Sequence, residues 1–287
     1  MNNPTYKKTF TIGGDLTINR LGFGAMRITG KGIWGPPENK SEAIKVLKRA
    51  IELGINFIDT ADAYGPYISE ELIAEALYPY PEGLVIATKG GLMRSGPNEW
   101  YPDGSPEHLK ETLEGSLKRL KLDTIDLYQL HRIDPKVLAE KTFSFLQQVQ
   151  KDGKIKHIGL SEVSVDEIKN AQQYFEVVSV QNMYSFDNRK WEPVLEFCAA
   201  NNIAFIPWNP MNAGNIDRLE VLRKIGENHH ADLHQVALSW LLHHSHNILL
   251  IPGTSSVAHL EENMKAGDIE LTENEMNEIE QVAAVKD

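Results

Sequence analysis

The chain has 287 residues, of which 41% are hydrophobic and 24% are charged, a composition typical of a soluble globular protein. Its formal net charge of -11 argues against nucleic acid as the main partner, because phosphate backbones bind to basic surfaces. Cys198 is the only cysteine, and no apolar run is long enough to span a bilayer. We therefore expect no membrane association and a cytoplasmic monomer or weak homo-oligomer.

The first predicted elements are two short runs in which apolar and polar residues alternate on either side of Gly13-Gly14-Asp15. This pattern predicts a β-hairpin over residues 8–18, which we expect to close the bottom of the fold. Further apolar runs lack the alternation, which is typical of parallel strands covered on both faces. These predicted strands are Arg20–Met26, Asn56–Thr60, Leu84–Thr88, Ile125–His131, His157–Leu160, Val177–Val180, Ala204–Pro207 and Ile248–Ile251.

Helical patterns alternate with these strands, and several start with capping residues, as in Ser105-Pro106-Glu107. The predicted helices are Lys40–Leu53, Ser69–Leu77, Pro106–Lys121, Pro135–Lys151, Val165–Tyr174, Trp191–Asn201, Asp217–Asn228 and Ala231–His243. A surplus helix is expected over Thr272–Val285. About eight strand-then-helix units without a linker predict an α/β fold, a single (β/α)8 TIM barrel over residues 1–287 with an extra C-terminal helix.

Candidate catalytic residues follow consecutive predicted strands, at the end of a barrel where chemistry takes place. Asp59 and Tyr64 lie in Asp59-Thr-Ala-Asp-Ala-Tyr64-Gly after the second strand, Lys89 follows the third strand, and His131 ends the fourth. A tyrosine has a free pKa of about 10, so it needs a nearby cation to act as an acid near neutrality. Neighbouring strands lie about 4.8 Å apart, so these side chains can meet.

Several motifs together resemble the aldo-keto reductase family. The match runs in order from about Leu21 to Asn263. Within the family, Gly35-Pro36-Pro37 and the unbroken segment 248–263 are most similar to a bacterial branch that includes pyridoxal reductases. The motifs are Asp59-Thr-Ala-x-x-Tyr64-Gly, Lys89, Leu130-His131, Gly159-Leu-Ser161, Val180-Gln181-Asn-x-Tyr184 and Ile251-Pro-Gly-Thr-Ser-Ser-x-x-His-Leu-x-Glu-Asn263.

The resemblance implies a role for each of the four candidate catalytic residues. Tyr64 is the general acid that protonates a carbonyl oxygen, and Lys89 lowers its pKa toward the working pH. Asp59 pairs with Lys89, and His131 donates to the carbonyl oxygen. Each residue alone is as compatible with a structural role as with a catalytic one, but the four together indicate a catalytic site.

The resemblance also implies a nicotinamide cofactor, although Gly22-Phe23-Gly24 lacks the third glycine of a Rossmann turn. Ser161 and Gln181 correspond to residues that bind the nicotinamide carboxamide, and Trp208 corresponds to an aromatic residue that stacks on the ring. Residues 253–256 open a helix at the position that holds the adenosine 2′-phosphate, although helix capping also explains at least one of these serines. The expected cofactor residues are Gly24, Met26, Asp59, Ser161, Gln181, Trp208, Asn209, Pro210, Met211, Gly214, Gly253, Thr254, Ser255, His259, Glu262 and Asn263.

Four positions depart from the usual family pattern. Glu162 replaces a common asparagine, Trp208 replaces a common tyrosine, Gly253 replaces a common lysine and His259 replaces a common arginine. The last two changes remove positive charge around the expected phosphate. We still expect NADPH, with NADH as the alternative, because the hydroxyl-rich helix start suits a phosphate better than a diol.

The expected substrate is a small aldehyde or ketone, with pyridoxal as the first candidate. Trp34, Arg94 and Trp100 are candidates for lining the substrate pocket, although generic surface covering explains these loops equally well. A redox-sensing nucleotide-binding module with slow turnover is an alternative function. A Schiff-base isomerase or aldolase using Lys89 is another, and it leaves Tyr64 unexplained. The histidine spacings fit no known zinc pattern, so no metal is expected.

Overall fold

The computed structural model describes residues 6–210 and 216–284. In it the N-terminal hairpin packs across one end of the barrel. Strands β1 (Thr9–Ile12) and β2 (Leu16–Asn19) pair in antiparallel fashion around a turn in which Gly13 and Gly14 have positive φ angles. The apolar face of the hairpin packs against residues at the amino ends of the barrel strands, among them Phe57. The hairpin therefore closes the bottom of the barrel, as predicted.

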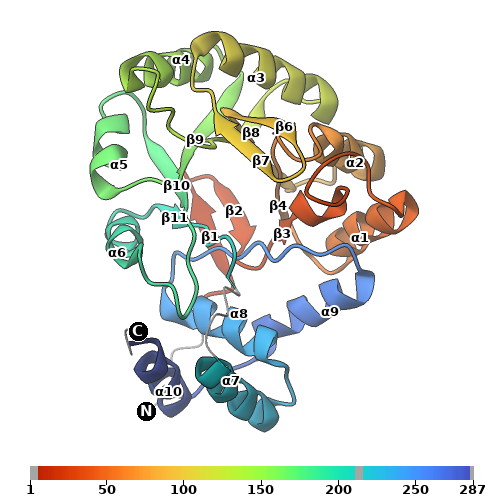
Figure 1. Ribbon diagram of the computed structural model, residues 1–287, viewed down its shortest axis with the longest axis vertical. Coiled ribbons are helices and arrows are strands. Elements are labelled where there is room, and N and C mark those ends of the chain that lie inside the picture. The colour runs from red at the N-terminus through yellow and green to blue at the C-terminus, as the bar shows by residue number, and fades with distance from the viewer. Residues whose placement is uncertain (1–5, 211–215, 285–287) are drawn as a thin grey trace.

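A curved parallel sheet forms the centre of the fold (Figure 1). Its order within the described residues is β11-β10-β9-β8-β5-β4-β3. The eighth predicted strand, Ile248–Ile251, joins the two edges through single bridges with Phe205 on one side and Leu21 on the other. The ring is thereby closed, and the predicted barrel is confirmed. The strands are β3 (Phe23–Gly24), β4 (Phe57–Asp59), β5 (Val85–Gly90), β8 (Ile125–Leu130), β9 (Ile155–Ser161), β10 (Val177–Gln181) and β11 (Ala204–Phe205).

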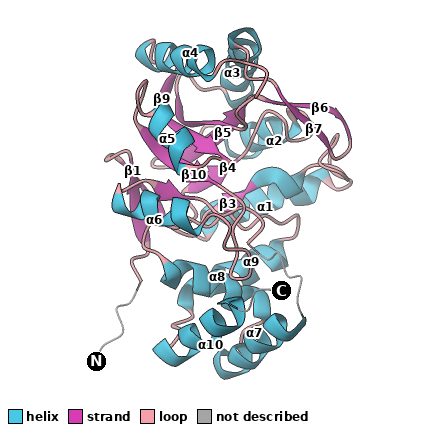
Figure 2. Cartoon of the chain, turned by 60° about the vertical axis from the view of Figure 1, so that its left-hand side comes forward, coloured by secondary structure: helices cyan, strands magenta, loops and turns pink. Residues whose placement is uncertain are grey.

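Most of the helices surround the sheet (Figures 1 and 2). Side-chain caps start several of them, and Ser164 and Asp232 each form a reciprocal capping box. None of the described helices combines the length and apolarity needed to cross a membrane. The helices are α1 (Lys40–Glu52), α2 (Ile68–Leu77), α3 (Pro106–Leu120), α4 (Ala139–Lys151), α5 (Val165–Ala171), α6 (Glu192–Ala200), α7 (Ile216–His229), α8 (Leu233–His244), α9 (Val257–Lys265) and α10 (Glu273–Ala284).

Three segments differ from the sequence prediction. The first predicted strand is cut short because Ala25–Ile28 turns into a 3-10 helix. The helix expected from Pro135 begins at Ala139, since an Asp134 carboxylate oxygen accepts a hydrogen bond from the Lys136 backbone N–H and holds a turn there. A second hairpin, β6 (Leu92–Gly96) with β7 (Glu99–Pro102), follows the third barrel strand where a loop was expected.

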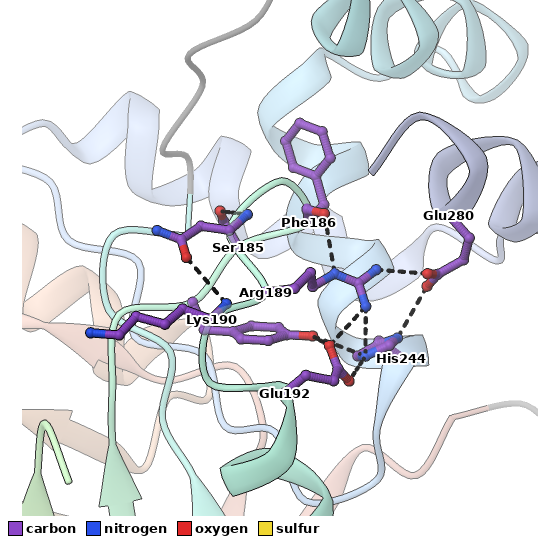
Figure 3. A network of polar contacts seen from close by, with 9 residues as sticks. Ser185, Phe186, Arg189, Lys190, Glu192, His244 and Glu280 are labelled. Carbon is purple, nitrogen blue, oxygen red and sulfur yellow. Dashed lines mark hydrogen bonds and ion pairs between the residues drawn. The ribbon is translucent and has the colours of Figure 1, made fainter. Parts of the chain in front are cut away.

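The C-terminal helix α10 is held by a network of charged groups (Figure 3). Arg189 donates to Glu192 at 2.9 Å and to Glu280 of α10 at 2.8 Å. The imidazole of His244 lies between the same two carboxylates, 2.9 Å from Glu192 and 3.2 Å from Glu280. Each carboxylate thus meets more than one basic partner, which ties α10 to α6 and α8.

Candidate active site

The four candidate catalytic residues meet at the carboxyl end of the barrel. Asp59 ends β4, Lys89 lies in β5, His131 directly follows β8, and Tyr64 lies in the loop after β4. All four are buried. The Lys89 ammonium donates to Asp59 Oδ1 at 2.5 Å, to the Thr60 carbonyl oxygen at 2.7 Å and to the Tyr64 hydroxyl at 3.3 Å. Each of its three protons therefore has an acceptor.

The electrostatics of the Tyr64–Lys89 pair keep the phenol protonated and the ammonium charged. Burial raises the pKa of Tyr64; Lys89 lowers it, but burial prevails and the pKa lies above its ordinary value. The sequence predicts that Lys89 brings the pKa of Tyr64 below its ordinary value, and this net shift is wrong. Lys89 does lower the pKa of Tyr64, but by less than burial raises it. Burial would lower the pKa of Lys89, but Asp59 and Tyr64 outweigh burial and raise it. Tyr64 is thus a protonated phenol with a cation beside its oxygen.

The imidazole of His131 lies on the other side of Tyr64. The two ring centroids are 5.9 Å apart and the planes are nearly perpendicular, at 82°. Burial, followed by the charges of Lys89 and Arg132, holds the pKa of His131 well below its ordinary value, so the ring is neutral. Its Nδ1 is buried and has no partner in the described part of the chain. The ring lines the adjoining cavity.

A cavity of about 880 Å³ opens onto these groups. Asp59, Tyr64 and His131 contribute to its wall, while Lys89 is fully buried behind them. Leu92 and Trp100 add apolar surface. The volume falls within the range of small-molecule sites, and the polar groups are few and convergent, as such sites require.

Ser161 and Gln181, the two residues expected to bind the carboxamide, line this cavity. Each also has a hydrogen-bond partner within the protein. Ser161 accepts a hydrogen bond from Arg132 at 3.0 Å, which leaves its own hydroxyl proton free to donate. Gln181 donates from Nε2 to Asp59 Oδ2 at 3.0 Å, and Gln129 donates to the same oxygen at 2.9 Å. The remaining Oε1 of Gln181 suits the N–H₂ of a carboxamide. These residues fit a nicotinamide.

Glu162 and Trp208, two of the departures from the family pattern, contact each other. Glu162 has a positive φ of 55°, and its Oε1 accepts hydrogen bonds from the indole Nε1 of Trp208 at 2.7 Å and from the Met183 backbone N–H at 2.5 Å. Trp208 lines the cavity, whereas Glu162 lies outside the lining. The carboxylate therefore holds the indole.

The other expected cofactor residues lie along a path from this cavity to helix α9. A second cavity of about 740 Å³ shares Met26, Arg27, Ile33 and Gly253 with the first. The second is also lined by Thr254 and Ser255, and the first by Gly24, Asn209, Pro210 and Asn263. His259 and Glu262 lie on α9 outside both linings. Met211 and Gly214 lie outside the described residues.

The three substrate-pocket candidates separate in the structure. Trp100 lines the large cavity, and its ring centroid is 6.4 Å from that of Tyr64. Trp34 and Arg94 are not part of the lining. The guanidinium of Arg94 lies 3.6 Å from the Trp100 ring centroid. It donates to the backbone carbonyl oxygens of Gly32, Ile33, Ala63, Gly96 and Glu99. Arg94 therefore supports Trp100 and joins three loops of the mouth.

Two residues of the site were missed by the sequence reasoning. Gln129 holds Asp59, and Arg132 holds Ser161. The signal for Gln129 is strand alternation, since it lies two residues before His131 in the same run and so points to the same face. Arg132 comes just after the end of the strand, and nothing in the sequence indicates where its side chain points.

The family model described as "Aldo/keto reductase family" matches residues 20–284. The chain belongs to the aldo-keto reductase family. A fission yeast relative, "Uncharacterized oxidoreductase C215.11c" of Schizosaccharomyces pombe, is 55% identical over 260 residues, covering 90% of this chain and 85% of the relative. Pyridoxine 4-dehydrogenase of Escherichia coli is 39% identical over 281 residues, covering 96% of this chain and 98% of the relative.

Solved structures of aldo-keto reductases have the same fold. The thermostable aldo-keto reductase Tm1743, solved with the inhibitor epalrestat, is 31% identical with a TM-score of 0.83, covering 96% of this chain and 99% of that one. An aldo-keto reductase from Klebsiella pneumoniae, solved in complex with NADPH, is 21% identical with a TM-score of 0.82, covering 96% and 95% of the two chains. The protein is therefore an oxidoreductase of this family.

Proposed function

We propose that the protein reduces a small aldehyde or ketone to an alcohol at the expense of NADPH, with Tyr64 as the general acid. The observation that carries this proposal is the contact between the Tyr64 hydroxyl and the buried Lys89 ammonium at 3.3 Å. A neutral phenol that faces a cavity and has a fixed cation at its oxygen is arranged to lose a proton to an acceptor in that cavity.

The groups around the cavity divide the reaction among them. The nicotinamide cofactor supplies a hydride to the carbonyl carbon when it is bound. Tyr64 gives its hydroxyl proton to the carbonyl oxygen, and Lys89 stabilises the phenolate that remains. His131, which is neutral, donates a second hydrogen bond to the same oxygen and helps to orient it. Asp59 keeps Lys89 charged and in place through the 2.5 Å contact.

The cofactor is proposed to extend from the large cavity to the start of α9. Ser161 and Gln181 hold the carboxamide, and Trp208 offers its indole face to the nicotinamide ring. Thr254 and Ser255 lie at the far end, where hydroxyls and backbone N–H groups suit a phosphate. This hydroxyl-rich helix start supports NADPH over NADH.

Pyridoxal is the proposed first substrate. Its support is the name of the Escherichia coli relative, pyridoxine 4-dehydrogenase, at 39% identity over nearly the full length of both chains. The aromatic wall formed by Trp100 beside Tyr64 also suits a flat heteroaromatic aldehyde.

A panel of aldehydes and ketones that includes pyridoxal, each supplied with NADPH or NADH, tests this function. We expect cofactor oxidation that depends on the carbonyl compound and is faster with NADPH at low cofactor concentration. Turnover with NADPH but not with pyridoxal would refute the substrate and keep the reaction. Tight NADPH binding with negligible turnover on the whole panel would refute the reductase and favour a redox-sensing module.

A further inference from the structure

We propose that Arg27 provides the positive charge that binds the cofactor 2′-phosphate and thereby selects NADPH over NADH. This inference rests on the proposed function, because it assigns a residue to the nucleotide of that same site. Arg27 lies in the 3-10 helix that follows β3, in a part of the chain distant in sequence from residues 253–256. It replaces the charge that is missing at Gly253 and His259.

Two backbone segments approach each other closely at Gly24 and Gly253. A Cβ atom added at Gly253 would lie 2.6 Å from the carbonyl oxygen of Gly24, closer than real Cβ atoms come to backbone. Position 253 therefore has no room for a side chain unless β3 or its following turn moves. The lysine that is common there in the family is excluded by packing, so a cation for the phosphate has to come from another element.

Arg27 lies beside Gly253. Its Cγ is 3.5 Å from the same Cβ position, so its stem passes beside Gly253. Arg27 lines both the cavity that contains Tyr64 and the one that contains Thr254. Its side chain is exposed, and within the described residues no ion pair or side-chain hydrogen bond engages it. Lys31 also lines the second cavity but does not line the first. Arg27 is therefore the uncommitted cation at the junction of the two cavities.

An acidic side chain, Glu42, lies at the start of α9. Helices α1 and α9 lie side by side (Figure 1). Glu42 of α1 accepts a hydrogen bond from the backbone N–H of Val257, the first residue of α9, at 3.4 Å, and it lines the second cavity. A carboxylate at this helix start repels a phosphate. The positive charge of Arg27, on the 3-10 helix, would offset this repulsion. Its planar guanidinium also suits two phosphate oxygens at once.

Equilibrium binding of NADPH and NADH to the purified full-length protein, followed by tryptophan fluorescence, tests the assignment. Arg27→Ala is expected to weaken NADPH binding by roughly tenfold or more, as one charge-assisted phosphate contact is lost, and to leave NADH binding within about twofold. Arg27→Gln, which keeps most of the stem beside Gly253, is expected to give the same result if the alanine variant is unstable. Glu42→Gln is expected to tighten NADPH binding.

Two controls separate this contact from general effects. Lys45→Ala removes one positive charge from an exposed position of α1 outside both cavity linings, and it is expected to change neither affinity. Competition by adenosine 2′,5′-bisphosphate should weaken in Arg27→Ala, while competition by adenosine 5′-phosphate should not. An equal loss of NADPH and NADH affinity, or none, would overturn the assignment. A wild-type protein that binds neither nucleotide would overturn the proposed function as well.

Discussion

Glu162 and Trp208 form a hydrogen-bonded pair at the barrel mouth, with 2.7 Å between the carboxylate Oε1 and the indole Nε1. The same oxygen accepts the Met183 backbone N–H at 2.5 Å. In sequence the two residues are separate departures from the family pattern, but in the fold one accepts the hydrogen bond that the other donates. Glu162 is therefore a positioning residue for the aromatic ring expected against the nicotinamide.

Replacement of Glu162 by alanine should loosen Trp208. We expect cofactor affinity to fall severalfold and the free energy of unfolding to fall by about 1–3 kcal/mol, because a partly buried indole N–H and a backbone N–H lose their acceptor. Cofactor titration and urea denaturation measure the two effects. Glu162→Gln keeps an acceptor oxygen and serves as the control, with a much smaller change. Unaltered cofactor affinity in the alanine variant would mean that the indole needs no support.

Removal of the Lys89 ammonium should affect both stability and activity. Lys89→Met leaves the Asp59 carboxylate buried without its cation, so the free energy of unfolding should fall by about 3–5 kcal/mol. Urea denaturation measures this loss. The double variant Lys89→Met with Asp59→Asn has neither charge and should regain part of the stability but no activity. A double variant as unstable as the single one would show that the buried charge is not the cause.

Trp100 should influence which carbonyl compounds are accepted. Trp100→Ala removes the aromatic wall beside Tyr64 and should lower kcat/KM for aromatic aldehydes more than for short aliphatic ones. Trp34→Ala is the matched control, because Trp34 also lies near Arg94 but outside the cavity lining. Equal losses for both classes of aldehyde would remove Trp100 from substrate selection.

The network at α10 should make stability depend on pH in a defined direction. Burial would lower the pKa of His244, but its contacts with Glu192 and Glu280 outweigh burial and raise it above 6.5. The stabilisation from a raised pKa is complete below the unfolded value and is lost as the pH rises through the folded value. The pKa of Glu192 is lowered to about 2, so this carboxylate stays ionised throughout that range.

We therefore expect His244→Asn to cost more unfolding free energy at about pH 6 than at about pH 9, measured by urea denaturation at both values. The wild-type advantage should shrink steadily as the pH rises. A cost that is independent of pH would mean that His244 acts through packing against Trp240 rather than through its charge.

The regular parts of the fold were predictable from the sequence because local patterns determine them. The Gly13-Gly14 turn marked the N-terminal hairpin, and continuous apolar runs marked the barrel strands. The hairpin of β6 and β7 was not predicted, because neither Leu92–Gly96 nor Glu99–Pro102 shows the alternation of apolar and polar residues that marks a strand. It is tied to other loops through Arg94 and the carbonyl oxygens of Gly32 and Ala63, which are contacts between distant segments.

The candidate site divides in the same way. The four candidate catalytic residues were located by their positions near strand ends, and the structure brings them together: Asp59, Tyr64, Lys89 and His131. The pairing of Glu162 with Trp208 and the approach of Gly24 to Gly253 depend on which strand ends are neighbours in space. A sequence shows such residues only as separate positions.

Tyr64→Phe tests whether Tyr64 donates the proton. The substitution removes one oxygen and keeps the ring that contacts His131 and Trp100, so the cavity should retain its shape. The measurement is the steady-state rate of NADPH-dependent aldehyde reduction, with NADPH affinity measured in parallel. We predict unchanged NADPH affinity and a rate lower by roughly 10²–10⁴-fold, the usual contribution of a general acid. A Tyr64→Phe protein with the full reduction rate would show that another group donates the proton.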